Sequence, residues 1–296
     1  MTSVAQAQHR EFSDASRHTV FPFVKWAGGK GGMVNELLRH IPINLTNYIE
    51  PFLGAGALFF GVSRNYDRFQ AFLSDTNEDL INTYKILKTD PEQLVAALCE
   101  VQGQYDETSH KSEFYYEIRR SKPSSPLERS VRFVFLNKTC YNGLFRVNSK
   151  GKFNVPFGRY ADPRICDAPN LRAVSKVLQT TDARVEVLDY VEATENCVAG
   201  DFVYFDPPYD PSSPTSSFTD YTPRGFSEKD QRNLAGVFKT LSDKGCRLLL
   251  SSSDTQLVRS LYDGFDMETA QANRSINSVG TRRTGFTELV ITNESR

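Results

Sequence analysis

NYIEPFLGAGALFFGV, residues 47–62, passes from a strand pattern through a glycine-rich turn into an apolar helix pattern. The same order recurs directly afterwards, because AFLSD at 71–75 predicts a strand and TNEDLINTYKILKTDP predicts a helix with Thr76 as its N-cap. Strands and helices that alternate in this way predict a parallel α/β sheet with crossover helices.

The alternation stops between residues 77 and 184. Helix patterns dominate there, at 91–102, 111–121, 127–138 and 168–178, and VNSKGKF predicts a β-hairpin between the runs FRV and FNV. Beyond residue 184 the α/β pattern resumes in RVEVLD, DFVYFD, SEKDQRNLAGVFKTLSD, CRLLLSS and TELVITN. We therefore predict an α/β core formed by 21–76 and 185–296, a mostly helical insertion at 77–184, and a flexible N-terminal extension at 1–20.

The charges of the chain are distributed unevenly. Its formal net charge is −1, but residues 111–160 contain eleven Lys and Arg against three Glu, an excess of 11 − 3 = +8. A local excess of this size indicates contact with a polyanion. A solvated helix face beside a basic loop is the alternative interpretation.

Several classes of protein do not fit the composition. No apolar run approaches the roughly 18–20 residues of a membrane-spanning helix, and the N-terminus lacks the apolar stretch of a signal peptide. The five cysteines are scattered and form no CxxC pair, which is typical of a reducing cytoplasm and does not indicate a structural zinc site.

Common catalytic and nucleotide-binding patterns are also missing from the sequence. A P-loop would need Gly at position 24 and Ser or Thr at 31, where the chain has Val24 and Gly31. A dinucleotide fingerprint starting at Gly54 would need Gly at position 59, which is Phe59. The four histidines lie away from the strand ends, so we expect neither a histidine base nor a metal.

Three predicted strands end in an acid: Glu50, Asp75 and Asp206. Ligands of open α/β sheets bind at this end of the strands. After Asp206, two prolines fix the backbone and remove two N–H donors, and Tyr209 adds a flat aromatic face. Rigid acceptors beside a stacking surface suit a flat ring with an exocyclic amino group, whose nitrogen becomes more nucleophilic when both hydrogens are bound. A stiff exit from a strand would also explain the two prolines.

Five motifs together resemble a known family. They are KWAGGK at 25–30, EPFLGAG at 50–56, SD at 74–75, YNGLFRVNSKGKFNVPFGRY at 141–160 and DPPY at 206–209. In this order they resemble the Dam-type DNA adenine methyltransferases (alpha group, D12 class), and in particular the GATC modification methylases of type II restriction–modification systems. The resemblance spans roughly residues 21–293 and implies a Rossmann-like methyltransferase sheet with an inserted, mostly helical DNA-recognition subdomain that carries a β-hairpin.

The resemblance implies S-adenosylmethionine as the methyl donor and adenine as the acceptor. The cofactor-binding positions of the family correspond here to Trp26, Lys30, Phe52, Gly54, Asp75 and Asp206. The catalytic positions correspond to Asp206, Pro207 and Tyr209. The Asp206 carboxylate and the Pro207 carbonyl would accept from the target amino group, and Tyr209 would stack on the adenine once it has flipped out of the duplex.

The resemblance also assigns the insertion to reading double-stranded DNA through its hairpin. The matching DNA-binding positions are Lys25, Tyr141, Asn142, Leu144, Arg146, Pro156, Arg159 and Tyr160. Arg and Lys suit the acceptors of guanine and apolar side chains suit the thymine methyl, which favours GATC as the target. Arg282 and Arg283 either contact phosphates or belong to a solvated loop.

We expect a cytoplasmic protein associated with the nucleoid through DNA, without a membrane partner, and a monomer in solution with a dimer on DNA left open. Two alternatives remain at this point. One is a catalytically silent DNA-binding protein of the same fold. The other is an amino-methyltransferase that acts on cytosine, RNA or protein; methylation at a cytosine ring carbon is less favoured, because none of the cysteines follows a proline.

Overall fold

A seven-stranded sheet forms the centre of the protein, with strand order β3–β2–β1–β4–β5–β7–β6. The computed structural model describes residues 20–148, 150–209, 226–272 and 286–293. The strands are β1 (Asn47–Glu50), β2 (Gln70–Asp75), β3 (Arg184–Val187), β4 (Phe202–Phe205), β5 (Arg247–Ser253), β6 (Asp266–Ala272) and β7 (Phe286–Thr292). Strands β3, β2, β1, β4 and β5 pair in parallel, whereas β7 pairs antiparallel with both β5 and β6. The predicted α/β class is confirmed.

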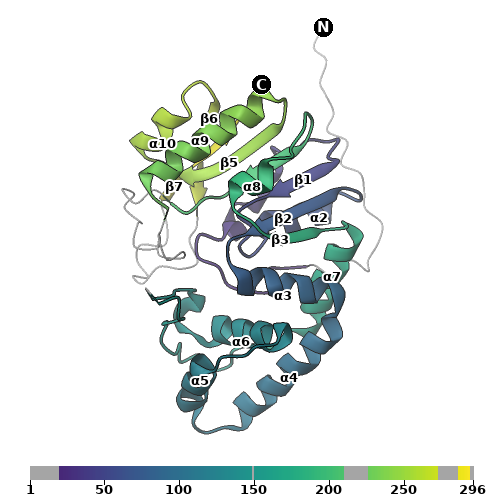
Figure 1. The fold of residues 1–296 in the computed structure, drawn as a ribbon, viewed down its shortest axis with the longest axis vertical. Helices are drawn as coiled ribbons and strands as arrows, with labels where there is room; N and C mark the ends of the chain where they lie inside the picture. Colours follow the sequence, from purple (N-terminus) through teal and green to yellow (C-terminus); the bar gives the residue numbers. More distant parts are fainter. Residues whose placement is uncertain (1–19, 149, 210–225, 273–285, 294–296) are drawn as a thin grey trace.

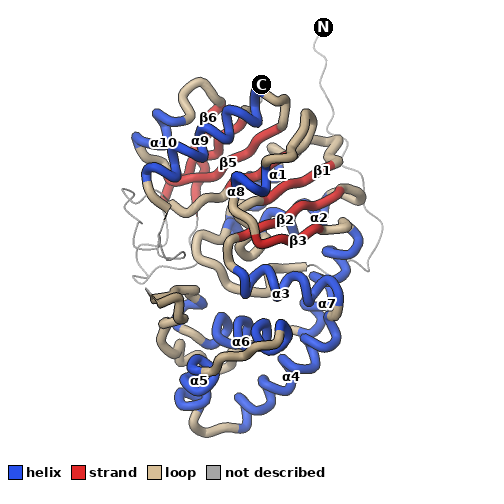
Figure 2. Tube along the Cα trace, in the orientation of Figure 1, coloured by secondary structure: helices blue, strands red, loops and turns tan. Residues whose placement is uncertain are grey.

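Helices surround this sheet and also form a separate group at one end of the molecule. They are α1 (Val34–Leu38), α2 (Ala57–Asn65), α3 (Glu78–Thr89), α4 (Pro91–Glu107), α5 (Lys111–Arg120), α6 (Pro126–Thr139), α7 (Ala168–Thr180), α8 (Tyr190–Thr194), α9 (Glu228–Asp243) and α10 (Gln256–Leu261), with 3-10 turns η1 (Lys30–Gly32) and η2 (Tyr141–Gly143). Helices α3 to α7 all come between β2 and β3 in the chain. Figure 1 shows α4, α5 and α6 at the bottom of the view, and Figure 2 shows the strands together above them. None of the helices described is long and apolar enough to span a membrane.

Strand β4 is buried on both faces, because its side chains alternate between two apolar clusters. Phe202 and Tyr204 belong to the cluster that includes residues of α1, α2 and the inserted helices. Val203 and Phe205 belong to the cluster that includes residues of α9 and α10. Burying a side chain of this size contributes roughly 1.5–3 kcal/mol, so the strand that leads to Asp206 is firmly held.

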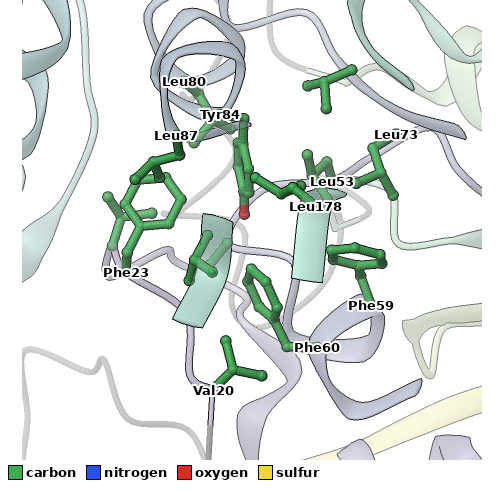
Figure 3. Close-up of a cluster of buried hydrophobic side chains, with 14 of the residues drawn as sticks. Val20, Phe23, Leu53, Phe59, Phe60, Leu73, Leu80, Tyr84, Leu87 and Leu178 are labelled. Atoms are coloured by element: carbon green, nitrogen blue, oxygen red, sulfur yellow. The ribbon is translucent and has the colours of Figure 1, made fainter. Parts of the chain in front are cut away.

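Helix α3 connects the sheet to the inserted helices. Figure 3 shows Tyr84 of this helix among Leu80, Leu87, Phe23 and Leu53. The Tyr84 hydroxyl donates to the Gly54 carbonyl at 3.3 Å. The glycine turn after β1 is therefore anchored to the same core that holds the insertion.

The N-cap predicted for this helix was wrong. Asn77 caps α3, and its side chain accepts a hydrogen bond from the Leu80 N–H at 3.0 Å. The Asp75 carboxylate binds the Asn77 N–H at 2.9 Å, which holds the end of β2 in a turn that places the cap after Thr76.

The structure also contains features that were not predicted. Strand β6 (DMETAQA) lacks an apolar run, and the helix expected at 91–102 continues to residue 107. Cys99 of α4 and Cys166 form a disulfide, although 67 positions separate them and neither lies in a CxxC pair. The remaining cysteines are buried free thiols: Cys140, Cys197 and Cys246. The predicted hairpin has one antiparallel bridge, between Val147 and Phe153.

Candidate active site

The carboxyl ends of β1, β2 and β4 meet at a cavity of about 960 Å³. Every residue assigned above to catalysis or to the cofactor lines this cavity: Trp26, Lys30, Phe52, Gly54, Asp75, Asp206, Pro207 and Tyr209. Parallel strands bring their carboxyl ends to one edge of a sheet, so the fold accounts for this convergence.

The glycine turn after β1 approaches the side chain of Trp26 closely. Gly54 has φ +47°, and a Cβ on it would lie 2.7 Å from Trp26 Cδ1, so only glycine fits without strain. Asp75 holds the turn from the next strand, because one of its carboxylate oxygens accepts from the Gly54 N–H at 3.0 Å. Burial raises the pKa of Asp75, and its backbone hydrogen bonds oppose that rise.

Lys30 places a buried positive charge against Asp206. It lies in η1, is 4% exposed, donates to the Gly28 carbonyl at 2.9 Å and forms an ion pair with Asp206 Oδ1. Burial lowers the pKa of Lys30, but the attraction of the Asp206 and Glu288 carboxylates outweighs this and holds the pKa well above its usual value. The ammonium group is therefore charged at neutral pH.

The carboxylate of Asp206 is oriented through one oxygen. Oδ1 accepts from Lys30 and also from the Ser251 hydroxyl at 3.1 Å. The Tyr204 hydroxyl lies 2.8 Å from Ser251 Oγ and extends this network into the core. Burial raises the pKa of Asp206, and Lys30 opposes that rise. Within the part of the chain that the structure describes, both hydrogen bonds to this carboxylate end at Oδ1, so Oδ2 is the oxygen available to a ligand.

Tyr209 is fixed by a residue that the sequence analysis missed. Its hydroxyl donates to Glu288 Oε1 at 2.7 Å, and its ring centroid lies 5.2 Å from Lys30 Nζ. Glu288 is 1% exposed and belongs to β7, on the far side of β5 from β4. The only sign of it in the sequence is an acid within the apolar run TELVITN.

Another buried acid lines the same cavity. Glu50 is 2% exposed and lines the cavity at the end of β1. The Tyr48 hydroxyl donates to its Oε2 at 2.9 Å. Burial raises the pKa of Glu50 well above its usual range, although the hydrogen bond from Tyr48 opposes the rise. The neutral form is therefore favoured relative to an exposed glutamate.

Phe52, which was predicted to bind the cofactor, belongs to an aromatic group of the cavity whose other members were not predicted. Phe52 stacks on Tyr190 with ring centroids 5.5 Å apart and interplanar angle 23°, and it meets the edge of Phe226 at 5.9 Å. Tyr190 and Phe226 come from separate segments, so no local pattern marks them.

The residues assigned to DNA reading lie beside the cavity and do not line it. Tyr141, Arg146, Pro156 and Arg159 are exposed, as is Lys25, and the partly buried members are Asn142, Leu144 and Tyr160. From the same segment, Phe145, Val147 and Gly151 border the cavity. Lys25 Nζ lies 4.2 Å from the Tyr160 ring centroid, so the N-terminal turn is in contact with residues 141–160, the segment predicted to read DNA and called the reading segment below.

Asn137 of α6 joins these two segments and was likewise missed. Its side-chain oxygen accepts from the Lys25 N–H at 2.8 Å, and its amide donates to the Lys25 carbonyl at 2.7 Å and to the Gly143 carbonyl at 3.2 Å. Trp26 stacks on Phe145 of the reading segment, with centroids 5.9 Å apart. The turn that carries Lys30 is therefore docked on the insertion.

Part of the basic excess at 111–160 has a structural use. Arg119 donates to the Val155 carbonyl at 3.0 Å, and Arg132 donates to the Arg119 carbonyl at 2.7 Å. Arg129 pairs with Asp79 at 2.7 Å. The bases that stay exposed in the reading segment are Arg146, Lys150, Lys152 and Arg159. Arg282 and Arg283 lie outside the described residues.

One group of potential metal ligands lies outside the cavity. Among the described residues, Glu36, His40 and Glu268 have ligand atoms within 4.8 Å of one another. Arg39 binds both carboxylate oxygens of Glu36, at 2.8 and 3.0 Å. The carboxylate is thus already engaged by a cation of the protein.

Known proteins are similar to the chain over most of its length. A family described as D12 class N6 adenine-specific DNA methyltransferase matches residues 26–276. Type II methyltransferase M.MjaIII of Methanocaldococcus jannaschii is 41% identical over 93% of this chain and 99% of its own length. Type II methyltransferase M1.LlaDCHI of Lactococcus lactis subsp. cremoris is 37% identical over 92% and 95%. A DNA adenine methylase of Escherichia coli is 35% identical over 90% and 93%.

Proposed function

Because the chain belongs to the D12 class of N6 adenine-specific DNA methyltransferases, we propose that it methylates the exocyclic amino group of adenine in double-stranded GATC, with S-adenosylmethionine as donor. The observation that carries this proposal is the shared cavity. The KWAGGK turn, the glycine turn and DPPY all line it, and the basic reading segment borders it. Residues 21–76 and 185–296 are then the catalytic domain and 77–184 the target-recognition insertion.

The cavity suits the donor in size and in chemistry. A volume of about 960 Å³ accommodates a nucleoside with its amino-acid chain together with a target base. Buried acids complement a cation, and the glycine turn lets the backbone approach it closely. The residues that would hold S-adenosylmethionine are Trp26, Lys30, Phe52, Gly54, Asp75 and Asp206. When bound, it supplies an electrophilic methyl group on a positively charged sulfur.

The target amino group would be bound by Asp206 Oδ2 and by the Pro207 carbonyl. Both are acceptors, and both are held rigidly, by Lys30 and Ser251 on one side and by the proline ring on the other. The amine nitrogen gives up a proton once it is methylated. Oδ2 is the nearby acceptor, and a raised pKa of Asp206 favours that transfer. Positioning and electrostatics thus contribute most of the catalysis.

Tyr209 would stack on the target adenine outside the helix. A base within the duplex cannot reach the donor, so the base must flip, at a cost of a few kcal/mol of lost stacking and pairing. Tyr141 and Asn142 would fill the gap, Tyr160 would contact the backbone, and Lys25, Leu144, Arg146, Pro156 and Arg159 would read the remaining bases. The exposed positions of Arg146 and Arg159 support major-groove contacts to guanine.

The proposal is tested by incubating the protein with labelled S-adenosylmethionine and a GATC duplex, with an Asp206→Ala variant as control. We expect N6-methyladenine in GATC with the native protein and none with the variant, while the variant still binds DNA. Unlabelled DNA despite cofactor binding would indicate a catalytically silent DNA-binding protein. Mass spectrometry of the labelled product separates adenine from a cytosine amine, RNA or protein target.

The same proposal gives the expected partners and compartment. The protein would act in the cytoplasm on nucleoid DNA, as a monomer in solution. Sedimentation of the protein with and without a GATC duplex tests this, since two copies on one duplex would instead indicate assembly on DNA.

A further inference from the structure

Glu288 is an acid in a place where acids are rarely found. It is 1% exposed, and the residues that follow it in β7, Leu289, Val290 and Ile291, are all buried and apolar. Its strand pairs with β5 on one side and β6 on the other, so the backbone cannot move it toward water. A buried carboxylate is costly unless charged or hydrogen-bonding partners compensate, and such positions are often functional.

Two residues of the proposed site contact Glu288. Oε1 accepts from the Tyr209 hydroxyl at 2.7 Å, and Oε2 lies 3.7 Å from Lys30 Nζ. Glu288 itself does not line the cavity. It therefore acts on the site through the stacking tyrosine and the lysine that holds Asp206.

Glu288 adds a carboxylate beside the Lys30–Asp206 ion pair. Its Oε2 lies 3.7 Å from the same ammonium nitrogen that binds Asp206. Opposite charges in a buried site interact strongly. The positive charge of Lys30 is therefore shared between the Asp206 and Glu288 carboxylates.

We infer that Glu288 is a positioning residue of the methyl-transfer site. It orients the Tyr209 ring through the hydroxyl and gives the Lys30–Asp206 pair the extra negative charge that a cationic donor requires. Methyl transfer moves a positive charge from sulfur to the target nitrogen, and the negative charge that Glu288 adds complements that charge. This inference rests on the proposed function.

Two ligands that differ in one charge test the inference directly. S-adenosylmethionine is a sulfonium cation, whereas S-adenosylhomocysteine has a neutral thioether at the same position. Glu288→Gln keeps an acceptor for Tyr209 but removes the negative charge. By calorimetry we expect the variant to lose about tenfold in affinity for the cation and less than about twofold for the thioether.

The kinetics provide a second measurement. We expect kcat/KM for S-adenosylmethionine of Glu288→Gln to fall about ten- to a hundredfold with KM for DNA within about threefold, because the added charge acts on the donor both when it is bound and in the transition state. Glu288→Asp keeps the charge and should retain the native preference for the cation, which also covers the case that the Gln variant folds poorly. Glu186→Gln is the matched control: this strand glutamate pairs with Lys85 at 2.9 Å but is half exposed and does not line the cavity.

The inference would be overturned if Glu288→Gln kept the native ratio of affinities for S-adenosylmethionine and S-adenosylhomocysteine together with kcat/KM for S-adenosylmethionine within about twofold of the native value. If the preference for S-adenosylmethionine over S-adenosylhomocysteine fell as much in Glu288→Asp as in Glu288→Gln, the inference would also be overturned, because side-chain shape and not charge would then be responsible. If the native protein methylates no adenine, the proposed function fails, while the two binding affinities still test the charge assigned to Glu288.

Discussion

Replacing Asn137 with alanine is expected to loosen the N-terminal turn from the inserted helices before the protein unfolds. Asn137 is 2% exposed at the end of α6 and makes three side-chain hydrogen bonds, two to the backbone of Lys25 and one to Gly143. A Cβ on Gly143 would lie 2.6 Å from Lys25 Cβ, so the two segments are in tight contact. Alanine would leave all three backbone groups without this partner.

The expected loss follows from these bonds. Each intramolecular hydrogen bond contributes about 1 kcal/mol net, so three lost bonds reduce the free energy of unfolding by about 3 kcal/mol. The close contact leaves little room for water to replace them, which makes this a lower estimate. Against a total of about 5–15 kcal/mol, the change is large.

The single tryptophan of the chain makes the assay specific. Trp26 is adjacent to Lys25 and stacks on Phe145, so its fluorescence reports docking of the turn, while circular dichroism reports the helices. In urea, the two signals of the native protein should change together. In Asn137→Ala we expect the fluorescence to change at lower urea than the circular dichroism.

A matched substitution controls for the loss of any asparagine. Asn65 is exposed at the end of α2 and donates one hydrogen bond, to the Gly61 carbonyl at 2.8 Å. Asn65→Ala should cost less than about 1 kcal/mol and keep the two signals coincident. If Asn137→Ala behaves in the same way, the reasoning about docking is refuted.

Substitutions at four further positions have expected outcomes. Gly54→Ala forces a side chain into φ +47° and against Trp26, so we expect a stability loss of about 1–2 kcal/mol and weaker S-adenosylmethionine binding by calorimetry. Gly103 of α4 is the contrasting position, because a Cβ there would meet nothing within 4 Å. Gly103→Ala should therefore stabilise the protein by about 0.5–1 kcal/mol. Burial lowers the pKa of Lys138 to about 8, so the folded state binds fewer protons than the unfolded state between that value and the usual 10.5. As the pH rises through this window, the unfolding free energy of the native protein should therefore increase relative to that of Lys138→Met, by on the order of 1–3 kcal/mol in urea titrations. A difference between the two proteins that does not change with pH would contradict the prediction. Arg159→Ala should reduce the preference for GATC over sites with one changed base by about 1–3 kcal/mol in competition assays, whereas uniform weakening would indicate a phosphate contact.

Local patterns were sufficient for the features that depend on neighbouring residues in the chain. The strand of residues 47–50, the glycine turn after it and the apolar run into Asp206 are all encoded within a few positions. Because parallel strands end at one edge, three separate strand-end acids could be expected in one cavity before any contact was known. The structure brings Glu50, Asp75 and Asp206 together there.

The features that were missed depend on contacts between distant positions. Glu288 meets Tyr209 across 79 positions, and Asn137 meets Lys25 across 112. Glu288 is a single acid at the start of the apolar run LVI, where nothing local indicates its partner, and Asn137 resembles a helix residue near a C-terminus. The wrong N-cap had a different cause, because Thr76 and Asn77 are both good caps by residue type, and the bond that the Asn77 N–H donates to Asp75 depends on how β2 ends.

The turn at residues 25–30 joins reading to chemistry more closely than the motif KWAGGK suggests. At its start, the backbone of Lys25 is hydrogen-bonded to Asn137, and the side chain of Lys25 lies over the Tyr160 ring. At its end, Lys30 binds Asp206. Trp26 packs between these ends, against Phe145 of the reading segment and against the glycine turn of the cavity. A shift of the reading segment on DNA would therefore reach the Asp206 carboxylate through one short, well-packed stretch of chain. The Asn137→Ala experiment measures how firmly that stretch is held.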